Sequence, residues 1–511
     1  MNDKAGVPES FQECLGNLME IRKLSAGQLS EMLQYKSKTT LLRVLQGKAG
    51  LRCIGNVYGD LCRCEALQLT DAETDRLHVA YEVELWGMET YRARSEMWRL
   101  LRCSETRHPV MQIHQTDGST LSLEAFLARF IPYTESDGCT KSDGCTESDG
   151  NIPVQHLEMC ILSGGYPYVM QVLADLLRRM GSSIHVTMIL QMTGDTARTV
   201  RLIRNLLPTL GYHTHEVFFN RQADVHPDPI YSTNGTGRAI LLQAMLPDGN
   251  TREFQILLRD ETTGVLLESP GLWQHWMQYA LPYAEQMQPL KAVLPEMTDY
   301  VRMLEYYAET ERNRETLIYK EDVAFHHIPT DILLHAFLES DNNTGMLDMV
   351  ARLRSIQEKR FQNVMTKRQP THWVASSAAL REFAMTGVQK DHFFAMRPFT
   401  REERLRIFRH LLTLVRENPY YHLYLMRPEE EDSFVNLEVT YLGGVGLQLT
   451  SSGTDYCIDD GWTETMLTEE SFCALYREFF LEELLPEYTC PPEETIAFLE
   501  EIIRMLQEKT E

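Results

Sequence analysis

Cations and hydroxyl groups are concentrated between Lys36 and Lys48, where their types and spacing suit the binding of a polyphosphate. No carboxylate occurs between Glu31 and Asp60, although the chain of 511 residues has a formal net charge of −24. The same interval contains five cations: Lys36, Lys38, Arg43, Lys48 and Arg52. A helix that presents Ser, Thr, Lys and Arg near its N-terminus fits the major groove of DNA. This pattern predicts a surface that binds double-stranded DNA.

Short amphipathic helices must position these side chains. Ser10 and Glu13 have capping-box spacing before the first helix, Ser25 and Gln28 have it before the second, and Gly47 suits the end of the third. The period of the apolar residues predicts five short helices and a helical connector, at about 11–23, 25–33, 37–46, 54–61, 70–83 and 91–101. Together they predict an all-α domain.

The second and third helices resemble the helix-turn-helix of Cro/C1-type regulators, also called the XRE family. Those regulators typically start the second helix with Leu-Ser and end the third with Thr-Ile-Ser-Arg-Ile-x-x-Gly. This chain has Leu24-Ser25 at the first place and Thr-Leu-Leu-Arg-Val-Leu-Gln-Gly over residues 40–47 at the second. The resemblance covers roughly residues 9–85. It departs at Ala26, where the family has glutamine, at Gln34, where it has glycine, and in a turn that is one residue longer.

Eight residues are predicted to contact DNA. Lys38 and Thr39 are expected near base edges or the adjacent phosphates, whereas Arg43 and Lys48 are expected near backbone phosphates, which supply affinity without sequence information. Hydroxyl groups at the start of the third helix are expected to cap it and to meet phosphate. The complete set is Gln28, Lys36, Ser37, Lys38, Thr39, Thr40, Arg43 and Lys48. Because one such domain reads a short half-site, a homodimer on a repeated operator is expected.

The remainder of the chain predicts a larger mixed α/β region, so the expected fold is α+β multidomain with an N-terminal all-α helix-turn-helix domain. Strands and helices alternate beyond residue 156, which favours a parallel sheet. The low-complexity tract 135–150 is expected to be a disordered loop or a domain boundary. Long helices are expected at 271–311, 469–485 and 492–509. Since a single core does not extend over 511 residues, three domains are predicted, at 1–95, 96–330 and 331–511.

The α/β layout loosely resembles the two-lobed phospholipase D-like fold. Catalysis in that family requires His-x-Lys, and none of the 16 histidines here is followed two places later by lysine. The sequence also lacks a Walker-type phosphate loop and a His-Glu-x-x-His zinc motif. His213 and His215 have strand spacing without an evident third ligand, and zinc requires at least three protein groups. No catalysis, cofactor or metal is therefore expected. A phospholipase D-like fold that lacks the catalytic motif would still suit ligand sensing.

These observations predict a cytoplasmic transcriptional regulator with a C-terminal sensory or oligomerisation region that responds to a small-molecule or protein effector. The polar start MNDKAGVPES lacks the order of a secretory signal, and no apolar run approaches the ~18 residues of a membrane span. Two alternatives stay open. One is a protein-interaction scaffold that uses the helical bundle. The other is an enzyme with an appended helix-turn-helix module, which needs a cluster of titratable groups in one α/β pocket, for example His185, Asp195 and His213.

Overall fold

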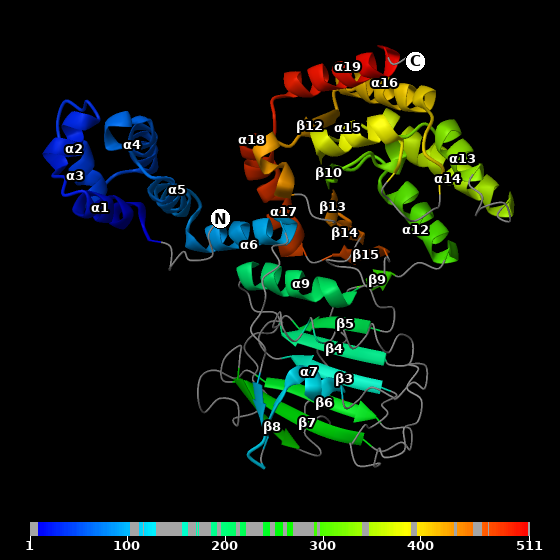
Figure 1. Cartoon of the computed structure of the whole chain (residues 1–511), viewed down its shortest axis with the longest axis horizontal. Helices are drawn as coiled ribbons and strands as arrows, with labels where there is room; N and C mark the ends of the chain where they lie inside the picture. The colour runs from blue at the N-terminus through cyan, green and yellow to red at the C-terminus, as the bar shows by residue number, and fades with distance from the viewer. Residues whose placement is uncertain are drawn as a thin grey trace, which may run out of the picture. The chain divides into compact units, whose positions relative to one another are not determined.

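The chain is mixed α/β, and Figure 1 shows its computed structural model. The structure describes residues 9–102, 112–115, 117–128, 156–161, 170, 172, 185–191, 196–210, 215–220, 239–245, 251–258, 263–268, 291–293, 297–339, 347–389, 396–433, 437–452, 462–468 and 470–508. Two compact units are distinguished, residues 1–96 with 195–197 and the rest of the chain. The N-terminal part is helical and a mixed α/β region follows, which confirms the predicted fold class. The finer boundaries at residues 95 and 330 stay predictions.

Helices account for the first unit. Their bounds are α1 (Phe11–Ile21), α2 (Ala26–Met32), α3 (Thr39–Leu45), α4 (Leu51–Arg63), α5 (Asp71–Trp86) and α6 (Met88–Arg102), the last of which continues into the second unit. Capping boxes form at three N-termini, between Ser10 and Glu13, Ser25 and Gln28, and Thr70 and Glu73. The predicted apolar faces share one core, with fully buried side chains that include Phe11, Leu15, Leu29, Leu41 and Val57.

Two helices of the first unit end with a non-glycine residue in the left-handed conformation, Lys23 with a φ of 51° and Gln34 with a φ of 58°. At the end of α2 the N–H of Tyr35 donates to the carbonyl of Ser30 at 2.8 Å, and the N–H of Gln34 donates to the carbonyl of Glu31 at 3.0 Å. This is the pattern of a Schellman motif. The backbone at residue 34 therefore has the geometry that favours glycine, although the residue is glutamine.

Replacing Gln34 by glycine is expected to stabilise the first unit by about 1 kcal/mol, because a side chain in the left-handed region costs about 1–2 kcal/mol. Urea unfolding of the full chain, followed by helical ellipticity, measures this change in the transition of the first unit. Gln46→Gly is the matched control, since Gln46 is exposed and has a φ of −90°. Glycine at residue 46 should lower stability, so equal effects of the two substitutions would contradict the interpretation.

The first sheet contains, among the described residues, eight strands in the order β2-β1-β8-β7-β6-β3-β4-β5. Their bounds are β1 (Gln112–His114), β2 (Thr120–Ser122), β3 (His156–Ile161), β4 (His185–Gln191), β5 (His215–Asn220), β6 (Ala239–Met245), β7 (Thr251–Leu258) and β8 (Thr263–Glu268). β3, β4 and β5 are parallel, whereas β6 runs antiparallel between β3 and β7. Two helices described in the same part of the chain are α7 (Leu123–Ala128) and α9 (Thr196–Leu210).

The second sheet contains seven described strands in the order β12-β11-β10-β13-β14-β15-β9. Their bounds are β9 (Lys291–Val293), β10 (Thr316–Tyr319), β11 (Thr371–Ala375), β12 (Tyr421–Leu425), β13 (Leu437–Leu442), β14 (Gly446–Ser452) and β15 (Trp462–Leu467). β10, β11 and β12 are parallel, and β12 lies at the edge of this strand order. The other pairings are antiparallel, so each sheet is mixed and not purely parallel.

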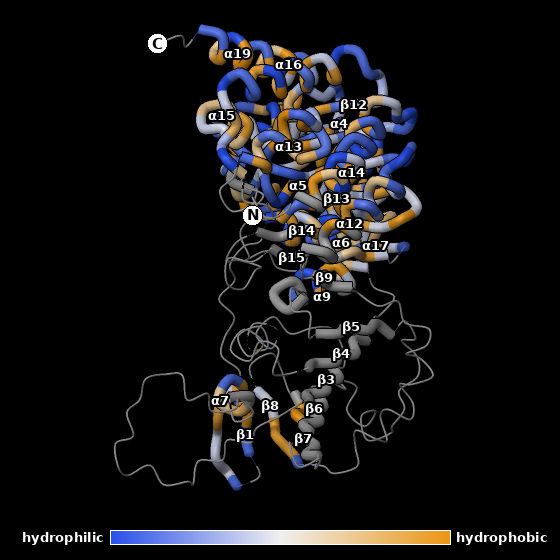
Figure 2. Tube along the Cα trace, turned by 90° about the vertical axis from the view of Figure 1, so that its right-hand side faces the viewer, coloured by the Kyte–Doolittle hydropathy of each residue, from blue (hydrophilic) through white to orange (hydrophobic). Residues whose placement is uncertain are grey.

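Helices cover the second sheet. Their bounds are α12 (Met297–Thr310), α13 (Thr330–Leu338), α14 (Leu347–Thr366), α15 (Ser377–Thr386), α16 (Arg401–Glu417), α17 (Glu470–Phe479), α18 (Leu485–Tyr488) and α19 (Pro492–Glu508). Trp373 and Leu423 of the sheet share a buried core with Phe383 on α15, Phe408 on α16 and Ile502 on α19. Polar and apolar residues alternate along α16 and α19 in Figure 2, as expected for helices with one buried face.

The C-terminal end of α6 packs on a π-helical turn at Phe480–Leu484 of the second unit. The indole N–H of Trp98 donates to Oε1 of Glu483 at 2.6 Å, and both side chains are buried. The Trp98 ring also lies edge-on to Phe479, with 5.0 Å between centroids. These contacts hold the second half of α6 in the second unit.

The structure corrects three predictions. Lys291–Val293, expected within a long helix, is a strand that pairs with β15. The helix expected at 469–485 is interrupted by the π-helical turn. The third helix begins at Thr39 and not at residue 37. The tract 135–150 lies outside the described residues. No helix in the described part of the chain is both long and apolar enough to cross a bilayer.

Candidate nucleic-acid interface

The eight residues predicted to contact DNA lie on α2, on α3 and on the two turns that flank α3. Seven of them are exposed and Thr40 is half-buried. Inward residues of the same helix, Leu41 and Val44, are buried in the core. The core therefore positions α3 so that its polar residues face outward.

The start of α3 differs from the sequence prediction. Lys38 occupies the N-cap position with helical backbone geometry and makes no side-chain cap hydrogen bond. The hydroxyl of Ser37 accepts the N–H of Thr39 at 3.4 Å and donates to Oγ1 of Thr39 at 3.1 Å. The prediction that Thr40 caps this helix is wrong, because its position falls inside the first turn. Ser37 therefore satisfies one of the first N–H groups of α3, and Lys38 does not cap the helix with its side chain.

The Gln28 side chain has a defined structural role at the start of α2. Its Oε1 accepts the N–H of Ser25 at 2.9 Å and the Ser25 hydroxyl at 2.9 Å. In return, the N–H of Gln28 donates to the Ser25 hydroxyl at 3.3 Å. Because the amide oxygen is engaged in this capping box, the NH2 group is the part of Gln28 that can donate to a phosphate.

A second Schellman motif brings Arg43 and Lys48 together at the end of α3. The N–H of Lys48 donates to the carbonyl of Arg43 at 2.8 Å, and the N–H of Gly47 donates to the carbonyl of Val44 at 2.9 Å. Gly47 has a φ of 64°, which explains the glycine at this turn. The backbone of the two exposed residues is therefore joined directly at the end of α3.

An open groove of about 730 Å³ lies beside the start of α3, and sequence analysis did not predict it. Thr40, Arg52, Asn56 and Arg63 are among its lining residues. Its carboxylate, Asp60, accepts a hydrogen bond from the Tyr35 hydroxyl at 2.7 Å and pairs with Arg63 at 3.2 Å. Burial and this carboxylate raise the pKa of Tyr35 above its usual range. Arg63 offsets the charge of Asp60, and Arg52 adds a further cation to the groove. Apart from the cation Arg52, the groove residues form no sequence pattern from which the groove could have been predicted.

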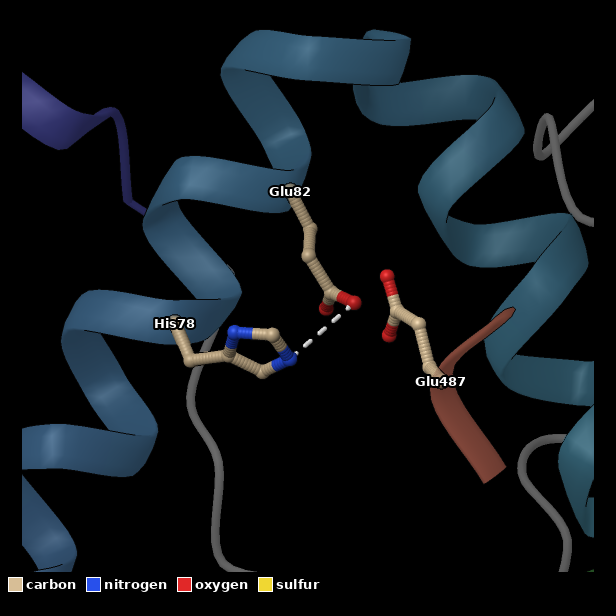
Figure 3. A group of neighbouring side chains, drawn as sticks. All are labelled: His78, Glu82 and Glu487. Carbon is tan, nitrogen blue, oxygen red and sulfur yellow. Dashed lines mark ion pairs between the residues drawn. The ribbon is translucent and has the colours of Figure 1, made fainter. Parts of the chain in front are cut away.

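A separate polar pair connects two turns of α5. In Figure 3, His78 and Glu82 point toward one another, with His78 Nε2 at 3.3 Å from Glu82 Oε1. The Tyr58 hydroxyl lies 2.9 Å from His78 Nδ1, and the Tyr58 ring stacks on Tyr81 at 4.6 Å. Glu487, also labelled there, belongs to α18 of the second unit. Within the first unit, Tyr58 on α4 and His78 on α5 thus join the two helices, and the His78–Glu82 pair has a structural role.

The three residues named for the enzyme alternative are only partly among those that the structure describes. His185 starts β4, whereas Asp195 and His213 lie outside the described residues, as does the contact that would join the three. His326 and His327, which follow β10, form a 3₁₀ turn in which His327 is fully buried. The Tyr421 hydroxyl lies 3.2 Å from His327 Nε2, so this histidine belongs to the core of the second unit.

Comparison with known proteins shows that the chain has only distant structural similarity to solved structures. Neither a protein-family model nor a curated protein matches the sequence. Polyphosphate kinase from Porphyromonas gingivalis aligns at 10% identity over 70% of this chain and 51% of its own, with a TM-score of 0.20. Phosphatidylserine synthase from Haemophilus influenzae aligns at 9% identity over 70% of this chain and 89% of its own, with a TM-score of 0.24. Both of these phospholipase D-like proteins are distant structural neighbours of the chain.

Proposed function

We propose that the chain is a DNA-binding transcriptional regulator of the helix-turn-helix type, whose second unit has a sensory or oligomerisation role. One observation carries the proposal: Lys36, Lys38, Arg43 and Lys48 are all exposed around α3, and no carboxylate occurs between residues 31 and 60. In a chain of net charge −24, such a surface attracts an anionic partner locally while the rest of the molecule repels it.

The shape of this surface favours duplex DNA over other anions. The exposed side of α3 offers Lys38 and Thr39 at its start and Arg43 one turn later, which matches a helix that enters the major groove by its N-terminal end. The turn after α3 adds the cation Lys48, and the start of α2 adds the amide of Gln28, at positions suited to the flanking backbone. Because α3 has seven residues, it reads few base pairs, and two copies on half-sites about 34 Å apart would supply the specificity of an operator.

The test is selection of genomic fragments with the purified full chain, followed by titration of the selected duplex at several salt concentrations. A regulator is expected to enrich a repeated sequence and to lose affinity steeply as salt rises, because cations bound to phosphate release counterions. Binding that is independent of ionic strength, or capture of a polypeptide with no duplex retained, would instead favour the scaffold alternative.

The Arg43→Ala substitution is expected to weaken binding about tenfold for the operator and for random duplexes alike, because a phosphate contact carries no sequence information. The slope of log affinity against log salt should become shallower by about 1. Fluorescence anisotropy with labelled duplexes measures both quantities. Arg92→Ala removes an exposed arginine on α6 and should change neither. A loss confined to the operator would show that Arg43 reads a base.

A further inference from the structure

Two histidines meet on neighbouring strands of the second sheet. In the parallel pairing of β11 with β12, His372 lies opposite His422. Their neighbours Trp373 and Leu423 point into the buried core, so alternation along the strands places both histidines on the other face of the sheet. Tyr424 follows on that same face, two residues after His422. All three side chains are half-buried.

These three side chains are close enough to act together. The imidazole rings of His372 and His422 are nearly parallel, with 4.9 Å between centroids and 21° between planes. The Tyr424 hydroxyl lies 3.3 Å from Nδ1 of His372, and its ring is 5.9 Å from that imidazole. Two imidazoles and a phenol oxygen therefore gather on a face that solvent reaches.

Burial governs the electrostatics of both imidazoles. Burial, aided by the neighbouring His422, lowers the pKa of His372 to about 4, and burial also lowers the pKa of His422. Lys367 and Glu315 act on His372 with opposite signs. Glu315 is itself paired with Arg477 at 2.6 and 3.0 Å.

We propose that His372, His422 and Tyr424 form a binding site for a borderline divalent transition-metal ion, with Cu²⁺ bound most tightly. One nitrogen from each imidazole supplies a ligand. The phenol oxygen keeps its proton, because burial raises the pKa of Tyr424, and it adds a weak third ligand, while water completes the coordination. Mixed nitrogen and oxygen ligands in a tetragonal arrangement suit Cu²⁺, which also leads the divalent affinity order. The stacked rings must rotate for a nitrogen of each to reach the same ion. β12 lies at the edge of the described sheet, so no further strand lies beside His422 and Tyr424 there.

The test is titration of the untagged full chain with Cu²⁺ in a glycine buffer that competes for weak sites, monitored by electron paramagnetic resonance. One site per chain is expected, with a signal split by two nitrogens. His372→Ala and His422→Ala should each lower the affinity at least tenfold, and Tyr424→Phe about threefold. The exposed His335 on α13 provides the matched control, His335→Ala, which should leave the affinity unchanged.

A thermal shift of the unmodified chain supplies a readout that does not depend on variants. Cu²⁺ should raise the melting temperature of the second unit, and His422→Gln, a substitution of similar size, should remove most of this rise. Unchanged affinity in both histidine variants would overturn the proposal, as would a signal without two nitrogen ligands or binding no tighter than that of the remaining histidines.

Discussion

Reversing two charges on α3, Lys38→Glu together with Arg43→Glu, is expected to lower the affinity for the selected operator about 1,000-fold at about 0.15 M salt. Each substitution removes a cation from the phosphates and puts a carboxylate in its place. The effect should exceed that of neutral substitutions, because like charges oppose docking along the whole approach. Both side chains are exposed, so the loss reflects the interface and not the core.

Measurement by fluorescence anisotropy separates this interpretation from unfolding. The slope of log affinity against log salt should become shallower by about 2 in the double variant, since each phosphate contact contributes about 0.9. A matched double variant, Lys23→Glu with Arg92→Glu, reverses two exposed cations of the first unit outside the interface. It has the same net charge as the test variant. If both double variants lose affinity equally, overall charge and not the surface of α3 governs binding, and the regulator proposal loses its main support.

Truncation of Glu403 is expected to cost the second unit about 3 kcal/mol, because one carboxylate serves two functions at the start of α16. It accepts the N–H of Thr400 at 2.8 Å as part of a capping box. It also accepts two hydrogen bonds from the guanidinium of Arg397, at 2.8 and 2.9 Å. Glu403→Ala would leave Arg397 and the helix start without this partner. Urea unfolding at pH 7 measures the loss.

The same carboxylate predicts a pH dependence with a definite sign. Arg397, followed by the hydrogen bonds from Thr400 and His335, lowers the pKa of Glu403 from 4.5 to about 2, in spite of its burial. A group with a lowered folded pKa contributes its stability above the unfolded pKa and loses it as the pH falls toward the folded value. The difference between the wild type and Glu403→Ala should therefore be constant above about pH 5 and shrink between pH 4.5 and 2.

Glu402→Ala is the matched control for this prediction. Glu402 lies in the same first turn of α16 but is exposed. Its substitution alters the helix dipole interaction by the same charge, so a loss below about 1 kcal/mol is expected. A Glu403→Ala loss that is no larger, or that persists undiminished at pH 2, would show that the ion pair and cap do not act as described.

Local interactions allowed the sequence to determine much of the first unit. The Ser10–Glu13 and Ser25–Gln28 capping boxes connect residues three apart, and both form where their spacing predicts. The apolar faces of α1 and α4 follow a 3.6-residue period that needs no knowledge of the partner helix. The acid-free interval that defines the candidate interface is likewise a property of the sequence, whereas its use in binding DNA is a prediction.

Tertiary contacts determined the roles of residues that lie far apart in the sequence. Lys291–Val293 is a strand only because β15 offers it hydrogen-bonding partners, and a three-residue segment has no period of its own to reveal this. Arg22 reaches Glu73 across 51 positions, with Nε of Arg22 at 2.9 Å from Oε1, and lowers the pKa of that carboxyl to about 2. His372 and His422 become neighbours solely through the register of β11 on β12. Such contacts depend on which strands and helices pair, and pairing is chosen by the burial of the whole core and not by any local pattern.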